Sequence, residues 1–121
     1  MTLDAAGLSR QSDWTTWHVT VVGIGIAGFS AADALSQLGA QVTVIDAADD
    51  DSRRERAEIL DTIGVRVLLG HEGMAPHDTD LLVVSPGLRP TAPVIVDALD
   101  RGIPVWGELE LAWRVRHPDT A

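Results

Sequence analysis

Three glycines spaced as G-x-G-x-x-G separate a run of β-branched residues from an alanine-rich stretch in "VTVVGIGIAGFSAADAL". Such a turn can hold a phosphate, because main-chain N–H groups and the dipole at the start of a helix favour an anion. We expect Gly23 to allow a tight bend, Gly25 to let a phosphate approach the backbone, and Gly28 to bring the helix close to the strand. The N–H groups around Ile26, Ala27 and Gly28 are therefore candidates for holding a diphosphate.

Asp46 ends the next β-branched run, "VTVID", 18 residues after Gly28. In a dinucleotide oxidoreductase, a carboxylate at this place accepts hydrogen bonds from ribose hydroxyls. In another nucleotide-binding domain it could accept from a ribose or from a base N–H. Two plainer interpretations stay open: Asp46 could cap a helix or turn, and the glycines could serve only a close crossing of helix and strand.

A second turn, "SPGLRP", follows the apolar run at residues 81–84. Because the carboxyl ends of parallel strands share one edge of a sheet, this turn should lie beside the glycine turn. Its candidate binding residues are Ser85, Gly87 and Arg89. Gly87 would bring the backbone close to a ligand, and Arg89 could pair with a phosphate or carboxylate. The alternative is a type II turn with a solvated arginine.

The elements that must position these turns alternate between strands and helices. We expect strands at residues 18–22, 41–45, 65–69, 81–84 and 103–106, and helices at 27–38, about 52–63, 93–101 and from 107 onward. Short connections and this alternation predict an α/β, Rossmann-like three-layer domain with about five parallel strands and helices on both faces. Residues 70–80 read as a loop with one helical turn, and residues 1–17 as an N-terminal extension whose Trp14 and Trp17 pack on the domain edge.

Composition narrows the possible functions. The chain has 18 acidic and 9 basic residues, a formal net charge of −9, and every basic residue is an arginine. An acidic surface argues against nucleic acid as a partner, because binding it requires basic groups that neutralise phosphates. An anionic ligand must then be held by local donors such as main-chain N–H groups. The absence of lysine excludes a Walker-type phosphate loop.

Other classes are excluded on similar grounds. No apolar run approaches the roughly 20 residues that span a bilayer, and the N-terminus lacks the pattern of a secretory signal, so we expect no membrane partner. The chain has no cysteine, which excludes disulfides and thiolate catalysis and fits a reducing compartment. We expect no metal site, because none of the histidines shows metal-ligand spacing with a carboxylate; they are His18, His71, His77 and His117.

Four stretches, "VTVVGIGIAGFSAADAL", "VTVIDA", "LLVVSPGL" and "GIPVWGELELAWR", together resemble the N-terminal domain of the Mur ligases over about residues 18–115. The most specific parts are the S-P-G at residues 85–87 and the G-E-L-E-L at residues 107–111. The resemblance is strongest to the branch that adds D-glutamate. The branch that adds L-alanine usually carries a G-G-x-G-M turn, which this sequence lacks.

This resemblance implies a Rossmann-like domain that binds the UDP of UDP-N-acetylmuramoyl-L-alanine in a cytoplasmic step of peptidoglycan synthesis. In that family ATP phosphorylates the substrate carboxylate, and the D-glutamate amine attacks the acyl phosphate, with magnesium stabilising phosphoryl charge. ATP, magnesium and D-glutamate are bound through other domains. The resemblance places diphosphate contacts on the backbone of Ile26 and Ala27, and uracil-side contacts on Asp46, Ala47 and Gly87.

The sequence departs from the family pattern directly after Asp46. Ala47 and Ala48 stand where relatives often have a hydroxyl or basic side chain, and Arg53 or Arg54 could supply the lost contacts. Residues 116–121 are expected to begin a linker to an absent central ATPase domain. Without a lysine or a phosphate loop, we expect no catalytic residue, no bound cofactor and no ligase activity in this chain alone.

Two other functions stay open. The chain could be an NAD-binding Rossmann module of an oxidoreductase or a redox-sensing regulator, because Asp46 is not followed by a basic residue. It could also be a non-catalytic interaction domain that keeps the fold without a ligand.

Overall fold

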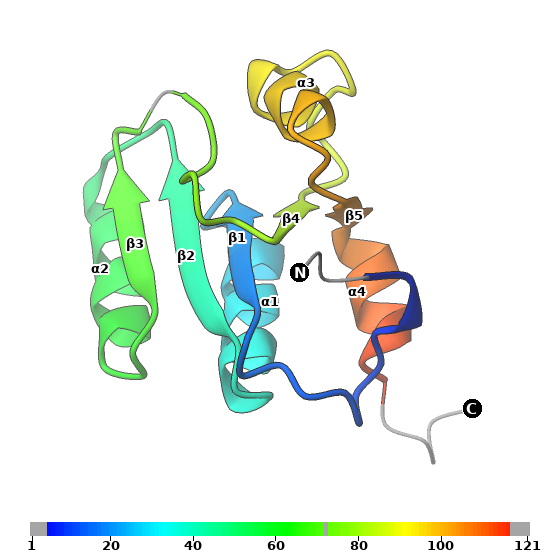
Figure 1. Ribbon diagram of the computed structural model, residues 1–121. Coiled ribbons are helices and arrows are strands. Elements are labelled where there is room, and N and C mark those ends of the chain that lie inside the picture. Colours follow the sequence, from blue (N-terminus) through cyan, green and yellow to red (C-terminus); the bar gives the residue numbers. More distant parts are fainter. Residues whose placement is uncertain (1–4, 72, 117–121) are drawn as a thin grey trace.

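A computed structural model describes residues 5–71 and 73–116, and Figure 1 shows their arrangement around a central sheet. The strands of the sheet are parallel and follow the order β3-β2-β1-β4-β5. The strands are β1 (His18–Val22), β2 (Gln41–Asp46), β3 (Arg66–Leu69), β4 (Leu81–Val84) and β5 (Val105–Gly107). The helices are the short 3₁₀ helix η1 (Ala5–Gly7), α1 (Ile26–Gln37), α2 (Asp51–Asp61), α3 (Pro93–Asp100) and α4 (Glu108–Arg114). The predicted Rossmann-like fold is confirmed.

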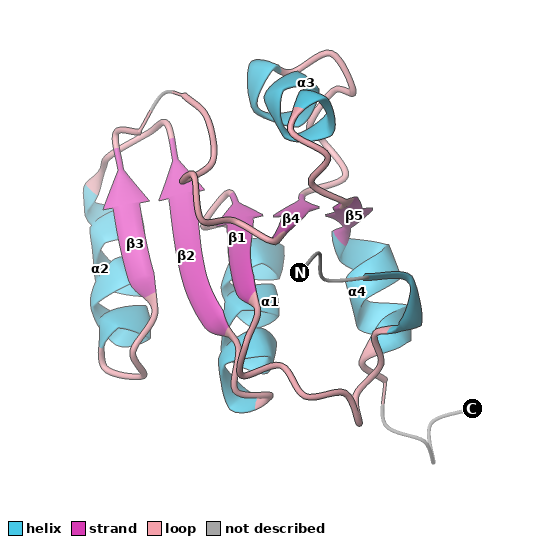
Figure 2. Cartoon of the chain, in the orientation of Figure 1, coloured by secondary structure: helices cyan, strands magenta, loops and turns pink. Residues whose placement is uncertain are grey.

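Alternating side chains divide the interior into two cores, because successive residues of a strand point to opposite faces of the sheet. Leu81 and Val83 of β4 join a core shared with α1, α2 and α4, whereas Leu82 and Val84 join a core shared with α3. Helices therefore cover both faces, as predicted (Figure 2). The four apolar residues of β4 are all buried, which is the pattern of a central strand in a parallel sheet.

Most elements begin or end within one or two residues of the predicted position, and the largest differences are in β5 and α2. β5 covers Val105–Gly107 instead of residues 103–106. The shift follows from Pro104, whose carbonyl accepts from the Leu82 N–H at 3.0 Å but which has no N–H to donate to the ladder. α2 ends at Asp61, slightly earlier than expected.

The described part of the loop at residues 70–80 contains one hydrogen-bonded turn and no helix, where a single helical turn was expected. The Thr79 N–H donates to the Pro76 carbonyl in a single turn. Gly70 and Gly73 both have positive φ, at 66° and 157°, and such residues interrupt a right-handed helix.

The segment before β1 contributes to the main core. Trp14 is fully buried and Trp17 is 4% exposed, so the prediction that they pack on the domain edge is wrong. The Trp14 ring lies 6.2 Å from that of Trp17 and 6.5 Å, edge-on, from that of Trp106. Its indole N–H donates to the Ser9 carbonyl at 3.0 Å. Aromatic packing therefore ties this segment to β5.

Candidate functional site

The carboxyl edge of the sheet brings the predicted turns together. Val22 of β1 pairs with Ile45 of β2 on one side and with Val84 of β4 on the other. The glycine turn, Asp46 and Ser85 directly follow these paired residues, so all three lie at the same edge. The chain order reverses between β1 and β4, and open α/β sheets bind ligands at such a switch point.

The three glycines have different surroundings in the turn. Gly23 has a φ of +101°, a left-handed conformation that glycine adopts without strain. A Cβ on Gly28 would lie 1.9 Å from the Gly23 carbonyl oxygen, so only glycine fits where α1 crosses the turn. A Cβ on Gly25 would meet nothing within 4 Å. The bend at Gly23 and the close crossing at Gly28 are as predicted, and the space beside Gly25 is open.

The first turn of α1 has main-chain N–H groups without acceptors in the described part of the chain. No acceptor among the described residues takes the N–H of Ile26, Ala27 or Gly28, as is usual for the first turn of a helix. Gly25, the N-cap, has no side chain to cap them, and its neighbours Ile26 and Ala27 are exposed. This is the arrangement that holds anions at a helix N-terminus.

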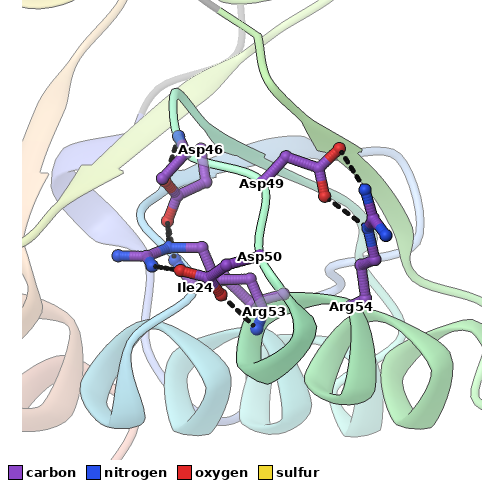
Figure 3. Close-up of polar contacts among 7 residues, drawn as sticks. Ile24, Asp46, Asp49, Asp50, Arg53 and Arg54 are labelled. Atoms are coloured by element: carbon purple, nitrogen blue, oxygen red, sulfur yellow. Dashed lines mark hydrogen bonds and ion pairs between the residues drawn. The ribbon is translucent and has the colours of Figure 1, made fainter.

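The Asp46 carboxylate connects the glycine turn to α2 (Figure 3). Its Oδ2 accepts from the Ile24 N–H at 3.0 Å and from Arg53 Nε at 3.2 Å. Its Oδ1 accepts from the Ala48 N–H at 2.9 Å. Asp46 therefore has the turn-capping role that was one of its possible interpretations, and its side chain remains 12% exposed.

The arginines at the start of α2 are paired with neighbouring aspartates (Figure 3). Asp50 caps the helix by accepting from the Arg53 N–H at 2.9 Å, and this bond is the main cause that lowers the pKa of Asp50. Arg53 also pairs with Asp50 through Nη1, whereas Arg54 pairs with Asp49 at 2.7 Å. The hydrogen bond to Asp46 is the main cause that raises the pKa of Arg53, so its guanidinium stays charged.

The second predicted turn is present at the end of β4. The Leu88 N–H donates to the Ser85 carbonyl at 3.1 Å. Gly87 is exposed and its φ is not positive, so the type II turn considered from the sequence is excluded. Arg89 is exposed; its carbonyl accepts from the Ala92 N–H at 2.9 Å, whereas its side chain makes no hydrogen bond or ion pair with another described residue.

Two hollows flank the glycine turn. One, of about 280 Å³, is lined by residues that include Asp46, Ala47, His71 and Leu88. The other, of about 490 Å³, is a groove between α1 and α4 whose walls are small and apolar apart from Ser30 and Glu108. The smaller hollow contains the acid and the exposed backbone predicted for the base side of a nucleotide.

Glu108 is a notable residue that the sequence did not single out for a site. Both of its carboxylate oxygens are buried without a hydrogen-bond partner among the described residues. Its Oε1 lies 3.7 Å from where a Cβ of Gly28 would be, and burial raises the pKa of this carboxyl. Its position in the sequence could have indicated a place near the site, because an acid directly after β5 falls on the same edge of the sheet as Asp46.

No three or more histidine, aspartate or glutamate side chains among the described residues are grouped to hold a metal ion; His117 lies outside the described residues. No helix in the described part of the chain has the length and apolar character to cross a bilayer.

A parallel sheet with a glycine turn at its first crossover, an open helix N-terminus and an acid after the second strand defines the class of Rossmann-like domains. The chain belongs to the Mur ligase family: the model described as "Mur ligase MurD-like, N-terminal domain" matches residues 17–107.

Curated relatives carry the name UDP-N-acetylmuramoylalanine–D-glutamate ligase. That of Streptomyces coelicolor is 47% identical over 105 residues, covering 87% of this chain and 22% of the relative. That of Thermobifida fusca is 51% identical over 99 residues, covering 82% and 21%. The chain thus spans about a fifth of the length of these relatives.

Solved structures show the same fold. The UDP-N-acetylmuramate–alanine ligase of Thermotoga maritima matches with a TM-score of 0.56 at 27% identity, over 76% of this chain and 21% of that one. A UDP-N-acetylmuramate:L-alanyl-γ-D-glutamyl-meso-diaminopimelate ligase of Neisseria meningitides matches with a TM-score of 0.63, over 79% and 30%. Its identity of 20% supports the fold alone.

Proposed function

We propose that this chain is the domain of a D-glutamate-adding Mur ligase that binds UDP-N-acetylmuramoyl-L-alanine through its UDP, with residues 18–115 forming the binding domain. The observation that carries this proposal is the exposed first turn of α1, whose N–H groups at Ile26 and Ala27 lack acceptors among the described residues. Family membership supports this choice of ligand, since relatives about 45% identical over most of this chain bear the name UDP-N-acetylmuramoylalanine–D-glutamate ligase.

The diphosphate is placed beside Gly25, on the main-chain N–H groups of Ile26, Ala27 and Gly28. This suits a chain of net charge −9, because main-chain donors and the helix dipole attract an anion without a basic side chain. The open space at Gly25 supports the same position.

The uracil side is placed in the smaller hollow. Asp46 Oδ1 accepts the base N–H, and Ala47 offers main-chain groups beside it. Ser85 and Gly87 border the ligand from the end of β4, and Arg89 supplies the nearby unpaired cation.

The bond-forming chemistry is assigned to parts of the ligase outside this chain. In the proposed reaction ATP activates the substrate carboxylate as an acyl phosphate, with Mg²⁺, and the D-glutamate amine then forms the amide. The residues present here do not fit ATP or Mg²⁺. The sequence has no lysine for a phosphate loop, and the described residues form no cluster of side chains that could hold a metal ion. In this proposal the chain binds and orients the substrate, and the ligase acts in the cytoplasm.

Titration calorimetry of the 121-residue chain with UDP, UDP-N-acetylmuramoyl-L-alanine and NAD tests the proposal. We expect both uridine ligands to bind and NAD to bind more weakly. Binding of NAD without UDP would replace the proposal by the dinucleotide-binding alternative that Asp46 leaves open. If none of the three ligands binds, the result would favour an interaction domain that keeps the fold without a ligand.

A matched pair of variants tests the position of the diphosphate. Gly25→Val fills the open space beside the N-cap, so UDP binding should be lost while the fold is kept. Gly7→Val is the control, because Gly7 also has nothing within 4 Å of its Cβ position and lies in η1. Equal UDP affinity in the Gly25 variant and the wild type would refute this position.

A further inference from the structure

Asp46 has nearly all of its hydrogen-bonding capacity in use before any ligand binds. An ionised carboxylate offers about four lone-pair sites, two on each oxygen. On Oδ2, one is taken by the Ile24 N–H and the other by Arg53 Nε. On Oδ1, one is taken by the Ala48 N–H. One acceptor position therefore remains, on Oδ1.

A single acceptor discriminates between the two kinds of nucleotide that a glycine turn of this type can hold. A dinucleotide presents a ribose with two neighbouring hydroxyls at the acid after the second strand, and engaging both takes one acceptor on each carboxylate oxygen. A uracil ring presents a single N–H donor, which one acceptor on Oδ1 satisfies.

We infer that Arg53 is a positioning residue that sets the nucleoside preference of this site, by occupying Asp46 Oδ2 and leaving one acceptor for the base. This inference rests on the proposed function, because it assumes that a nucleoside diphosphate binds at the glycine turn. Arg53 reaches Asp46 from the neighbouring α2 helix (Figure 3).

Arg53 is held in this position through both its main chain and its guanidinium group. Its N–H donates to Asp50, the N-cap of α2, and its Nη1 pairs with the same carboxylate. The side chain is 35% exposed, compared with 62% for Arg54. Arg54 pairs with Asp49 and has no bond to Asp46 among the described residues. Arg54 therefore carries the same charge on the same helix without touching the acid.

The test is the ratio of the UDP and NAD dissociation constants, measured by titration calorimetry on the full chain. In Arg53→Met the second position on Oδ2 becomes available to a ribose hydroxyl, and the preference for UDP over NAD should fall about tenfold, the worth of one hydrogen bond to a charged acceptor. Arg54→Met removes the same charge and should leave the ratio unchanged. Thermal melts verify folding, and Arg53→Ala replaces the methionine variant if that variant does not fold.

The ratio of the two dissociation constants separates the possible outcomes, because a general loosening of the fold lowers the affinity for both ligands alike. An unchanged or increased UDP preference in the Arg53 variant overturns the inference and leaves the proposed function standing. An equal fall in the Arg54 variant also overturns it, since charge alone would then explain the effect. A wild-type chain that binds no UDP overturns the proposed function itself.

Discussion

Replacing Gly28 by alanine is the sharpest test of how the glycine turn is built. The new methyl would lie 1.9 Å from the Gly23 carbonyl oxygen and 2.9 Å from its carbon. Ordinary van der Waals contact starts at 3.4 Å, so α1 or the turn must move by about 1.5 Å. Both clashing atoms belong to the backbone, and no side-chain rotation can relieve them.

The magnitude follows from three opposing contributions. Alanine in place of glycine favours a helix by about 1 kcal/mol. Overpacking costs about 1–3 kcal/mol, and displacing the turn threatens the bond from the Gly23 N–H to the Ile45 carbonyl at 2.8 Å, worth about 1 kcal/mol. We therefore expect Gly28→Ala to lower the free energy of unfolding by about 2 kcal/mol.

Urea denaturation followed by tryptophan fluorescence measures this free energy, because Trp14 and Trp17 are buried in the folded state. Gly25→Ala is the control: its Cβ position is open and its φ is −65°, so its change should stay within about 0.5 kcal/mol. A Gly28 variant that unfolds at the wild-type urea concentration, with the same m-value, would show that α1 does not cross the turn as closely as described.

Three further changes have defined outcomes. Trp14→Ala empties a fully buried aromatic site and should lower the free energy of unfolding in urea by about 3–5 kcal/mol. The control, Trp113→Ala, changes a 62% exposed position and should lower it by under about 0.5 kcal/mol. Equal losses would contradict the described core. Glu108→Gln should stabilise the chain by about 1 kcal/mol at pH 7, because the desolvation of an unpaired carboxylate outweighs its attraction to the α4 dipole. Burial raises the pKa of Glu108 in the folded state, so the charged form costs its full amount of stability only above that pKa. The gain should fade as the pH falls from the folded pKa to the unfolded value of about 4.3, and it should be absent below that value; a pH-independent gain would contradict this cause. Asp46→Asn, which loses an acceptor for Ile24 or Arg53, should lower the melting temperature by several degrees, and an unchanged melting temperature would show that these bonds contribute little.

Local residue order was enough to predict most of the scaffold. Short β-branched runs and glycines that end helices specify β1, β2 and β4 because strand and helix periods are properties of neighbouring residues. The common edge of the glycine turn and Ser85 also followed, since parallel strands with right-handed crossovers leave little freedom in how their ends align. Gly23 and Gly28 were assigned correctly because backbone sterics act over a few residues.

Only the tertiary structure decided which distant groups meet. Trp14 precedes the first strand without a periodic pattern, and its burial depends on Trp106, which comes from the far end of the chain. The occupation of Asp46 Oδ2 by Ile24 and Arg53 requires three separate segments to converge. Glu108 is buried because α4 packs against α1, and nothing adjacent to it in sequence imposes that. Sequence alone therefore determined which turns share one edge of the sheet, whereas long-range packing decided how many unpaired hydrogen-bond acceptors and donors remain at that edge.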